Sequence, residues 1–233
     1  MTQIGEDKMI RVLLLGDGVT GKTSVVKRFQ NLNHDGFPTA WDEYNLVVPH
    51  NNKSTSLIVT DFSGCENYDR MRLESYSNSD IFLIFFSVVN PTNIDNIKSK
   101  WYPELRQLQP KKPIILVGTK IDLRDTQDAS AKFGNKIITR LQGQKLARDI
   151  GAISYLECSS ETGQGIKEVF ENVVFSYEDP NSNLTNVNEP SGFSLRNLIP
   201  SFLLSPPKPK VDEPVGPQVE DDSDPNNSPH NAL

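Results

Sequence analysis

One segment, GDGVTGKT at residues 16–23, constrains the fold more than any other part of this chain. It matches the pattern G-x-x-x-x-G-K-[ST], and it stands between a β-like run at 8–15 and a helix-prone run at 21–31. The glycines allow consecutive backbone N–H groups to surround phosphates, and the N-terminus of the following helix adds positive potential. The lysine reaches the β- and γ-phosphates, and the threonine hydroxyl is a ligand for Mg²⁺. The residues predicted to bind phosphates are Gly16, Asp17, Gly18, Val19, Thr20, Gly21, Lys22, Thr23 and Ser24.

The first three quarters of the chain alternate strand-like and helix-like runs, which predicts an α/β fold with helices on both faces of one sheet. We expect a mostly parallel six-stranded sheet of the P-loop NTPase class, with ligands at the carboxyl ends of the strands. This context disfavours the alternative for residues 16–23, a glycine-rich turn in an unrelated α/β protein. The strand-like runs are 8–15, 45–49, 55–60, 81–88, 113–117 and 153–157. The helical patterns are 21–31, 93–108, 139–150 and 165–177.

The segment VGTKIDL at 117–123 predicts which base the site accepts. It follows an apolar strand, so its Asp122 carboxylate lies at the ligand edge and can accept hydrogen bonds from guanine N1–H and the 2-amino group. Adenine offers neither donor, and a site of this kind rejects the wrong partner strongly. The alternative, a solvated loop of ordinary charges, is disfavoured because the same chain holds the phosphate-binding segment. The residues predicted to contact the base are Thr119, Lys120, Asp122 and Leu123, together with Cys158, Ser159 and Ser160 after the last strand.

The last 55 residues, 179–233, differ in composition from the rest. They hold ten of the sixteen prolines, with eight acidic and three basic residues, in a chain whose net charge is −6. A segment this polar and proline-rich buries too little apolar surface to offset its ordering entropy. We therefore predict a globular domain over 1–178 and a disordered acidic tail over 179–233 that contains an apolar patch at 193–204.

The composition also excludes several functional classes. An acidic chain lacks the basic face that nucleic-acid binding requires, so we expect no nucleic-acid partner. No apolar run is long enough to span a bilayer, and two cysteines, Cys65 and Cys158, do not suggest a disulfide framework. These features predict a cytoplasmic protein, or one at a cytosolic membrane face, and we expect a monomer.

Seven segments together resemble a Rho/Rac-family small GTPase of the Ras superfamily, over residues 8–178. The sequence TKID and a charged, helix-prone insertion near 125–138 are typical of the Rho family. The resemblance implies a Ras-like G domain that binds GTP or GDP with Mg²⁺ and hydrolyses GTP to GDP and phosphate. The matching segments are GDGVTGKT (16–23), PTAWDEY (38–44), DFSG (61–64), YDRMR (68–72), KWYPEL (100–105), PIILVGTKIDLRD (113–125) and YLECSS (155–160).

The resemblance also implies roles for single residues. Thr39 resembles the switch I threonine, whose hydroxyl binds Mg²⁺ and whose amide meets the γ-phosphate. Asp61 resembles the aspartate that holds a Mg²⁺-bound water, and Gly64 resembles the switch II glycine whose amide contacts the γ-phosphate. Release of that phosphate would free both loops. The implied metal-binding residues are Thr23, Thr39 and Asp61, and the implied catalytic residues are Lys22, Thr39, Gly64 and Cys65.

Three further residues match the effector loop of this family. Asp42 and Tyr44 match residues with which Rac-like proteins bind CRIB-type effectors. Trp41 is expected to be an exposed aromatic anchor of the same surface, because aromatic residues dominate interface energetics. The implied partners are effector proteins of the actin cytoskeleton or of trafficking, and exchange factors.

Cys65 departs from the family pattern, because it stands where the family has the glutamine that orients the attacking water. A thiol is shorter and forms only weak hydrogen bonds, so we predict slow GTP hydrolysis and a bias towards the GTP-bound state. Gly36, in place of a switch I tyrosine, adds an expectation of faster nucleotide exchange. Two alternatives stay open: a conventional cycling GTPase that tolerates Cys65, and a nucleotide-bound scaffold without catalysis.

The tail also departs from the family. Family members usually end in a C-a-a-X box with a prenylated cysteine, whereas this sequence has no cysteine after Cys158, so we expect no prenyl anchor. The apolar patch at 193–204 suits peripheral membrane contact or partner binding. It equally suits packing against the GTPase domain, and the sequence does not decide between these alternatives.

Overall fold

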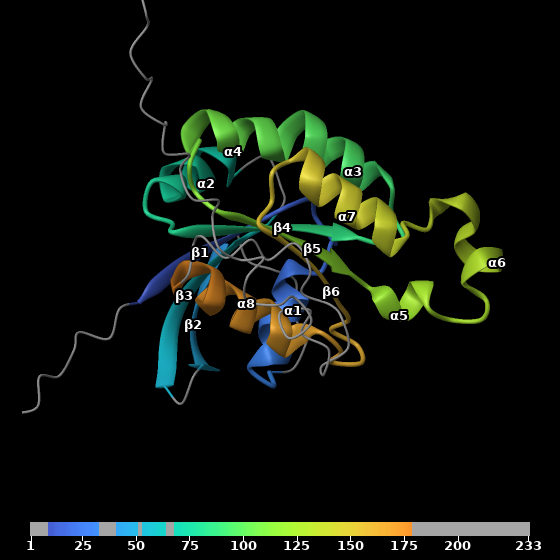
Figure 1. Cartoon of the computed structure of the whole chain (residues 1–233), viewed down its shortest axis with the longest axis horizontal. Helices are drawn as coiled ribbons and strands as arrows, with labels where there is room; N and C mark the ends of the chain where they lie inside the picture. The colour runs from blue at the N-terminus through green and yellow to red at the C-terminus, as the bar shows by residue number, and fades with distance from the viewer. Residues whose placement is uncertain (1–8, 33–40, 51–52, 64–67, 179–233) are drawn as a thin grey trace, which may run out of the picture. The chain divides into compact units, whose positions relative to one another are not determined.

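The computed structural model describes residues 9–32, 41–50, 53–63 and 68–178, and the fold given below concerns these residues (Figure 1). The predicted tail at 179–233, with its apolar patch, lies outside them. Within the described part of the chain, no helix combines the length and the apolar character needed to cross a membrane.

Six strands of the described chain form one sheet in the order β2-β3-β1-β4-β5-β6. Every neighbouring pair is parallel except β2 and β3, which are antiparallel. This arrangement confirms the predicted α/β fold with a mostly parallel six-stranded sheet. The strands are β1 (Ile10–Leu15), β2 (Trp41–His50), β3 (Lys53–Phe62), β4 (Ile81–Ser87), β5 (Ile114–Thr119) and β6 (Ser154–Cys158).

The apolar runs become the central strands because both of their faces are covered. Each residue of β4, with the sequence IFLIFFS, and of β5, with the sequence IILVGT, is buried. In contrast, β2 forms one edge of the sheet, and its residues alternate between covered and exposed sides over much of its length. A strand with one covered face shows such an alternation.

Helices cover both faces of the sheet, as predicted (Figure 1). On one face, α1 and α8 pack over an apolar cluster that includes Val25, Phe170 and Val173. On the other face, α2, η2, α4 and α7 pack over a second cluster that includes Trp101 and Leu146. The main helices are α1 (Lys22–Phe29), α2 (Asp69–Tyr76), α3 (Thr92–Asn96), η2 (Ile97–Trp101), α4 (Tyr102–Leu108), α7 (Arg140–Asp149) and α8 (Ile166–Glu178).

The helical region predicted at 93–108 is a continuous run of three segments, α3, η2 and α4, and η2 is a π-helical turn. The pattern had not indicated α2, because its sequence DRMRLESY lacks an apolar stripe. Between β5 and α7 lie three short helices, and two of them fall in the predicted insertion at 125–138. They are α5 (Ile121–Arg124), α6 (Ala129–Phe133) and η3 (Gly134–Lys136).

Candidate nucleotide-binding site

The ends of four strands meet at one edge of the sheet and carry the predicted site. Strand β1 leads into Gly16, β3 carries Asp61 next to its end, β5 ends at Thr119, and β6 ends at Cys158. These four strands run parallel to one another, and so does β4, which lies between β1 and β5 in the sheet. Their carboxyl ends therefore lie on the same side. This is the edge at which open α/β sheets bind ligands.

Lys22 closes the loop of residues 16–21 from the first turn of α1. Its Nζ atom donates hydrogen bonds to the carbonyl oxygens of Gly16 and Asp17, both at 2.9 Å. The side chain is buried, and burial lowers the pKa of Lys22 while the carboxylates of Asp61 and Asp17 oppose that shift. The ammonium group is therefore held over the loop. An anionic ligand there would favour the charged form of Lys22, which burial disfavours.

Two glycines give the loop its backbone shape. Gly16 has φ of +129°, and a Cβ atom there would lie 2.4 Å from the carbonyl oxygen of Phe85. Gly21 has φ of +97° and caps the N-terminus of α1 without a side-chain hydrogen bond. Both positions favour glycine because residues with a Cβ atom rarely adopt these positive φ values. The helix N-terminus thus presents backbone donors rather than a capping side chain.

The Asp17 side chain supports the loop from the side of the neighbouring helical run. Its Oδ2 atom accepts hydrogen bonds from Asn93 at 2.7 Å and Asn96 at 2.8 Å, and its Oδ1 atom accepts one from Trp101 Nε1 at 2.8 Å. The carboxylate is thus directed to α3 and η2. Any contact between Asp17 and a phosphate would consequently be made by the Asp17 backbone, and this contact stays a prediction.

Thr23 and Asp61 come together on the side of the loop next to β3. The Thr23 hydroxyl donates to Asp61 Oδ2, while Asp61 Oδ1 is buried and has no hydrogen-bond partner within the described residues. Burial raises the pKa of Asp61, and Lys22 and Thr23 act in the opposite direction. An orphaned carboxylate oxygen next to a hydroxyl provides the oxygen donors that Mg²⁺ prefers.

This donor set fits the predicted Mg²⁺ site. Among the described residues, no group of three His, Cys, Asp or Glu side chains could hold a metal ion. Mg²⁺ does not need such a group, because it is usually held by one or two protein oxygens together with waters and substrate phosphates. The third predicted ligand, Thr39, lies outside the described residues, as do Gly64 and Cys65.

The base side of the site is tied directly to the phosphate loop. The buried Thr119 hydroxyl contacts the carbonyl oxygen of Thr20 and lies 3.0 Å from that of Phe86. Lys120 follows with φ of 64°, and its half-burial lowers its pKa. Asp122 lies in the first turn of α5 and is half-buried. Thr119 therefore fixes the spacing between the segment 119–123 and the loop of residues 16–21.

The loop after β6 is braced by its own backbone. The Ser159 amide donates to the carbonyl oxygen of Gln164 at 2.9 Å, and the Ser159 side chain accepts from the Thr162 amide at 3.1 Å. Cys158 is fully buried, and burial raises the pKa of its thiol to about 12. Because Ser159 is engaged within the loop, the predicted contact of residues 158–160 with the base stays a prediction, and Ser159 contributes to the shape of the loop.

The predicted effector residues lie at the start of the edge strand β2. Trp41 is 44% exposed, and its ring packs against Phe62 with centroids 6.5 Å apart, while its role as an anchor for effectors stays a prediction. The Tyr44 hydroxyl donates to Asp42 at 3.4 Å, and burial together with that carboxylate raises the pKa of Tyr44 to about 12. Next to Trp41, a hollow of about 330 Å³ extends to Met71 on α2.

Residues for which the motifs implied no role also hold the site together. Asn93, Asn96 and Trp101 contact Asp17, and Arg124 and Glu157 join the segments on the base side. A partial signal for the first group was present, because Asn93 and Asn96 lie three positions apart in a helix-prone run and so share one side of it. No sequence pattern indicated the ion pair, since its two members lie 33 positions apart.

The family model described as Ras family matches residues 11–179, which include every strand and helix described above except the first residue of β1. The match therefore covers more than half of the chain and contains the whole candidate site.

Proposed function

This chain belongs to the Ras family, and we propose that it is a GTP-binding switch of the Rho/Rac type that is biased towards its GTP-bound state. Family membership supports the coarser statement directly: the protein is a small GTPase that binds guanine nucleotide with Mg²⁺ and works with effectors and exchange factors. The subfamily, the slow hydrolysis and the identity of the effectors are the parts that we propose.

Two sequence features support the Rho/Rac type. The base-reading segment has the sequence TKID, and the charged segment at 125–138 separates it from α7. Within that segment the structure has the short helices α6 and η3, which is compatible with a helix-prone insertion. A comparison of binding to a CRIB-type peptide in the GTP- and GDP-loaded states tests the assignment. Equal binding in both states would contradict it.

The observation that carries the proposed bias is Cys65, in the segment DFSGC at 61–65. Phosphoryl transfer depends on positioning and electrostatics, and a glutamine orients the attacking water in this class of enzyme. A thiol forms weak hydrogen bonds and has no second donor group, so it orients water poorly. Loss of one such contact, worth about 1.4 to 3 kcal/mol, corresponds to roughly 10- to 100-fold in rate.

The residues at the phosphate edge fit a Mg²⁺ ion that would be held by Thr23 and by Thr39, with Asp61 nearby. When bound, the ion neutralises charge on the phosphates. The chain's own contribution is to hold Lys22 over the loop through the carbonyl oxygens of Gly16 and Asp17, and so to place a fixed positive charge at the phosphates.

Single-turnover hydrolysis of bound GTP tests the proposal. We expect the Cys65→Gln variant to hydrolyse GTP roughly 10- to 100-fold faster than the natural chain, because it restores a group that can accept from water and donate to phosphate. Cys65→Ser is the matched control, since it changes the thiol without adding reach. Equal rates for the natural chain and Cys65→Gln would contradict the proposed bias, and nucleotide binding itself would be unaffected by that result.

We also propose a cytoplasmic location with peripheral contact at cytosolic membrane faces through the apolar patch at 193–204. Apolar side chains followed by lysines suit the boundary between headgroups and acyl chains. Co-sedimentation with anionic vesicles, compared between the full chain and a variant lacking 193–204, measures this contact. Equal sedimentation of both proteins would remove the proposal.

A further inference from the structure

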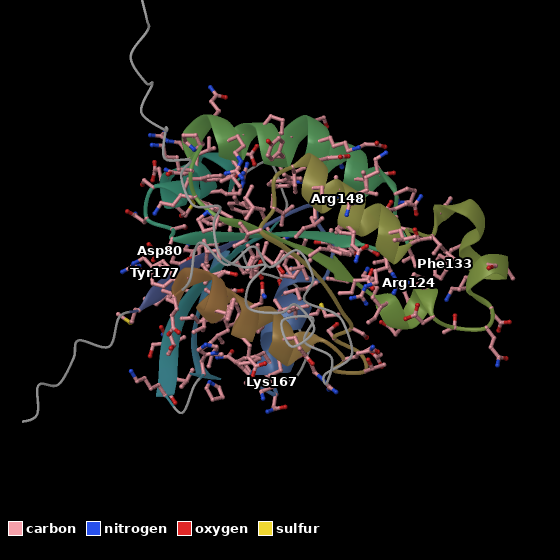
Figure 2. All side chains as sticks on the ribbon, in the orientation of Figure 1. Asp80, Arg124, Phe133, Arg148, Lys167 and Tyr177 are labelled. Atoms are coloured by element: carbon pink, nitrogen blue, oxygen red, sulfur yellow. The ribbon has the colours of Figure 1, made fainter. Side chains whose placement is uncertain are left out.

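A buried ion pair joins the two segments that are predicted to contact the base. Arg124 at the end of α5 donates from Nη1 and Nη2 to the two carboxylate oxygens of Glu157 near the end of β6, at 2.7 and 2.9 Å. The Glu157 side chain is 4% exposed and that of Arg124 is 15% exposed. Figure 2 labels Arg124 on α5, where this helix adjoins the sheet. The geometry is the bidentate fork that makes arginine–carboxylate pairs directional.

Tyr155 completes the hydrogen bonding of this carboxylate. Its hydroxyl donates to Glu157 Oε1 at 2.6 Å, and its ring stacks on Phe86 with centroids 6.1 Å apart. Two glycines make room for the ring. A Cβ atom would lie 2.2 Å from Tyr155 at Gly143 and 2.9 Å from its hydroxyl at Gly118. The carboxylate is therefore fixed by three hydrogen bonds in a fitted slot.

The pair connects the predicted base-reading groups through short lengths of chain. Arg124 follows Asp122 by two residues, and Glu157 directly precedes Cys158. Asp122 and Arg124 both belong to α5, and this helix has only four residues. A helix this short has little stability of its own, so its position depends on side-chain anchors. Ile121 and Arg124 are the anchors that α5 offers to the rest of the fold.

We infer that the pair Arg124–Glu157, together with Tyr155, is a positioning device that fixes Asp122 relative to residues 158–160 and so sets both the selectivity for guanine and the lifetime of bound nucleotide. This inference rests on the proposed role of Asp122 in contacting the base. The three residues act through Asp122 and do not touch the nucleotide themselves. We call them the base clamp.

Replacement of the fork by a point charge is the most direct perturbation of the base clamp. Arg124→Lys keeps the positive charge opposite Glu157 but cannot form two parallel hydrogen bonds. The helix α5 is then held less firmly, and the Asp122 carboxylate loses its fixed distance to the base. We expect release of GDP to become about tenfold faster, which corresponds to a tenfold lower affinity for GDP if the rate of binding is unchanged.

Selectivity separates positioning from general stability. Inosine diphosphate lacks the 2-amino group of GDP, so the ratio of the two affinities reports the hydrogen bond between that group and Asp122. We expect Arg124→Lys to lower this ratio roughly tenfold. A merely structural role would lower the melting temperature and speed the release of both nucleotides equally, with the ratio unchanged. That outcome would overturn the inference.

Three further variants of the full chain complete the experiment. Arg106→Lys is the matched control, because Arg106 donates to the backbone carbonyls of Pro110, Lys112 and Gly151, none of which belongs to the base clamp. It should leave the GDP to inosine diphosphate ratio unchanged. Tyr155→Phe removes one hydrogen bond and no charge. It should lower the ratio in the same direction, and it provides the comparison if Arg124→Lys does not fold.

Asp122→Ala distinguishes the two hypotheses. If this variant keeps the natural ratio, Asp122 does not contact the 2-amino group and the proposed base recognition fails. If it loses the ratio while Arg124→Lys and Tyr155→Phe keep it, base recognition stands and the base clamp is refuted. The measurement is displacement of a fluorescent GDP analogue by each nucleotide in the presence of Mg²⁺.

Discussion

The Asp17 carboxylate offers the clearest quantitative prediction, because its three hydrogen bonds leave little freedom for a substitute. Oδ1 accepts from the indole of Trp101, and Oδ2 accepts from the amides of Asn93 and Asn96. In Asp17→Asn, one of the two oxygens becomes an NH₂ group. Whichever way the new amide is oriented, at least one donor then faces another donor.

The least costly orientation leaves the indole N–H without an acceptor. A buried donor without a partner costs about 1 to 3 kcal/mol, and the two remaining bonds lose the advantage of a charged acceptor, about 1 kcal/mol each. Because Asp17 is only half-buried, water reduces this total, and we expect a loss of about 3 kcal/mol. For a domain of this size, that corresponds to a fall in Tm of roughly 6 to 12 °C.

Calorimetry of the two proteins with saturating GDP and Mg²⁺ measures this loss, and chemical denaturation checks it independently. Asp95→Asn is the matched control, since Asp95 is exposed on α3 and the same chemical change there should cost about 0.5 kcal/mol or less. A Trp101→Phe variant closes a double-mutant cycle with Asp17→Asn. If Asp17→Asn costs no more than the control, the support that α3 and η2 give to the loop is not as described.

Three other predictions follow from local features of the site. Gly16→Ala should prevent stable folding or cost more than about 3 kcal/mol, because it combines a backbone conformation that disfavours side chains with a Cβ at 2.4 Å from a carbonyl oxygen. Gly134→Ala, with positive φ but open space, should cost less, about 1 to 3 kcal/mol by the same denaturation assay. In Cys65→Ser, the remaining thiol, Cys158, should resist a thiol reagent at about pH 8 until the protein is unfolded, because its pKa is raised to about 12 and it is fully buried. Burial raises the pKa of Asp61 above 3.8, so the folded chain without Mg²⁺ loses stability as the pH rises from 3.8 through the raised value. Mg²⁺ favours the ionised form, and the rise in Tm that it produces should therefore grow as the pH increases above 3.8; a rise that shrinks with increasing pH would contradict the placement of Asp61 at the Mg²⁺ site.

The sequence identified the parts of the fold whose pattern is local. Apolar runs such as 81–88 and 113–117 became β4 and β5 within about two residues at each end, because strands buried on both faces have no polar side. The phosphate-binding segment was equally clear, since the unusual backbone angles of the loop require glycine at fixed positions, and these glycines can be read in the sequence. The order of the strands, β2-β3-β1-β4-β5-β6, was not predicted, because it depends on pairings between segments that are distant in the sequence.

Helix α2 could not be predicted in this way, because its covered side is not apolar. Its two buried residues are Arg72 and Tyr76, one turn apart. Arg72 forms an ion pair with Glu104 on α4, and its guanidinium lies 4.8 Å from the ring centroid of Trp101. These partners are distant in the sequence, so the helix depends on tertiary contacts that no periodicity within DRMRLESY reveals.

The same distinction applies to the candidate site. A motif names the groups that face the ligand, because phosphates and guanine impose their chemistry on those positions. The chemistry of the ligand does not dictate the types of the groups that hold them in place. These groups are two asparagines and a tryptophan behind Asp17, and an arginine, a glutamate and a tyrosine near Asp122. On each side of the site, a charged side chain near the ligand edge is thus anchored to a separate helix or strand. Substitutions at these supporting positions should therefore alter nucleotide lifetime and selectivity while every residue predicted to contact the nucleotide stays unchanged.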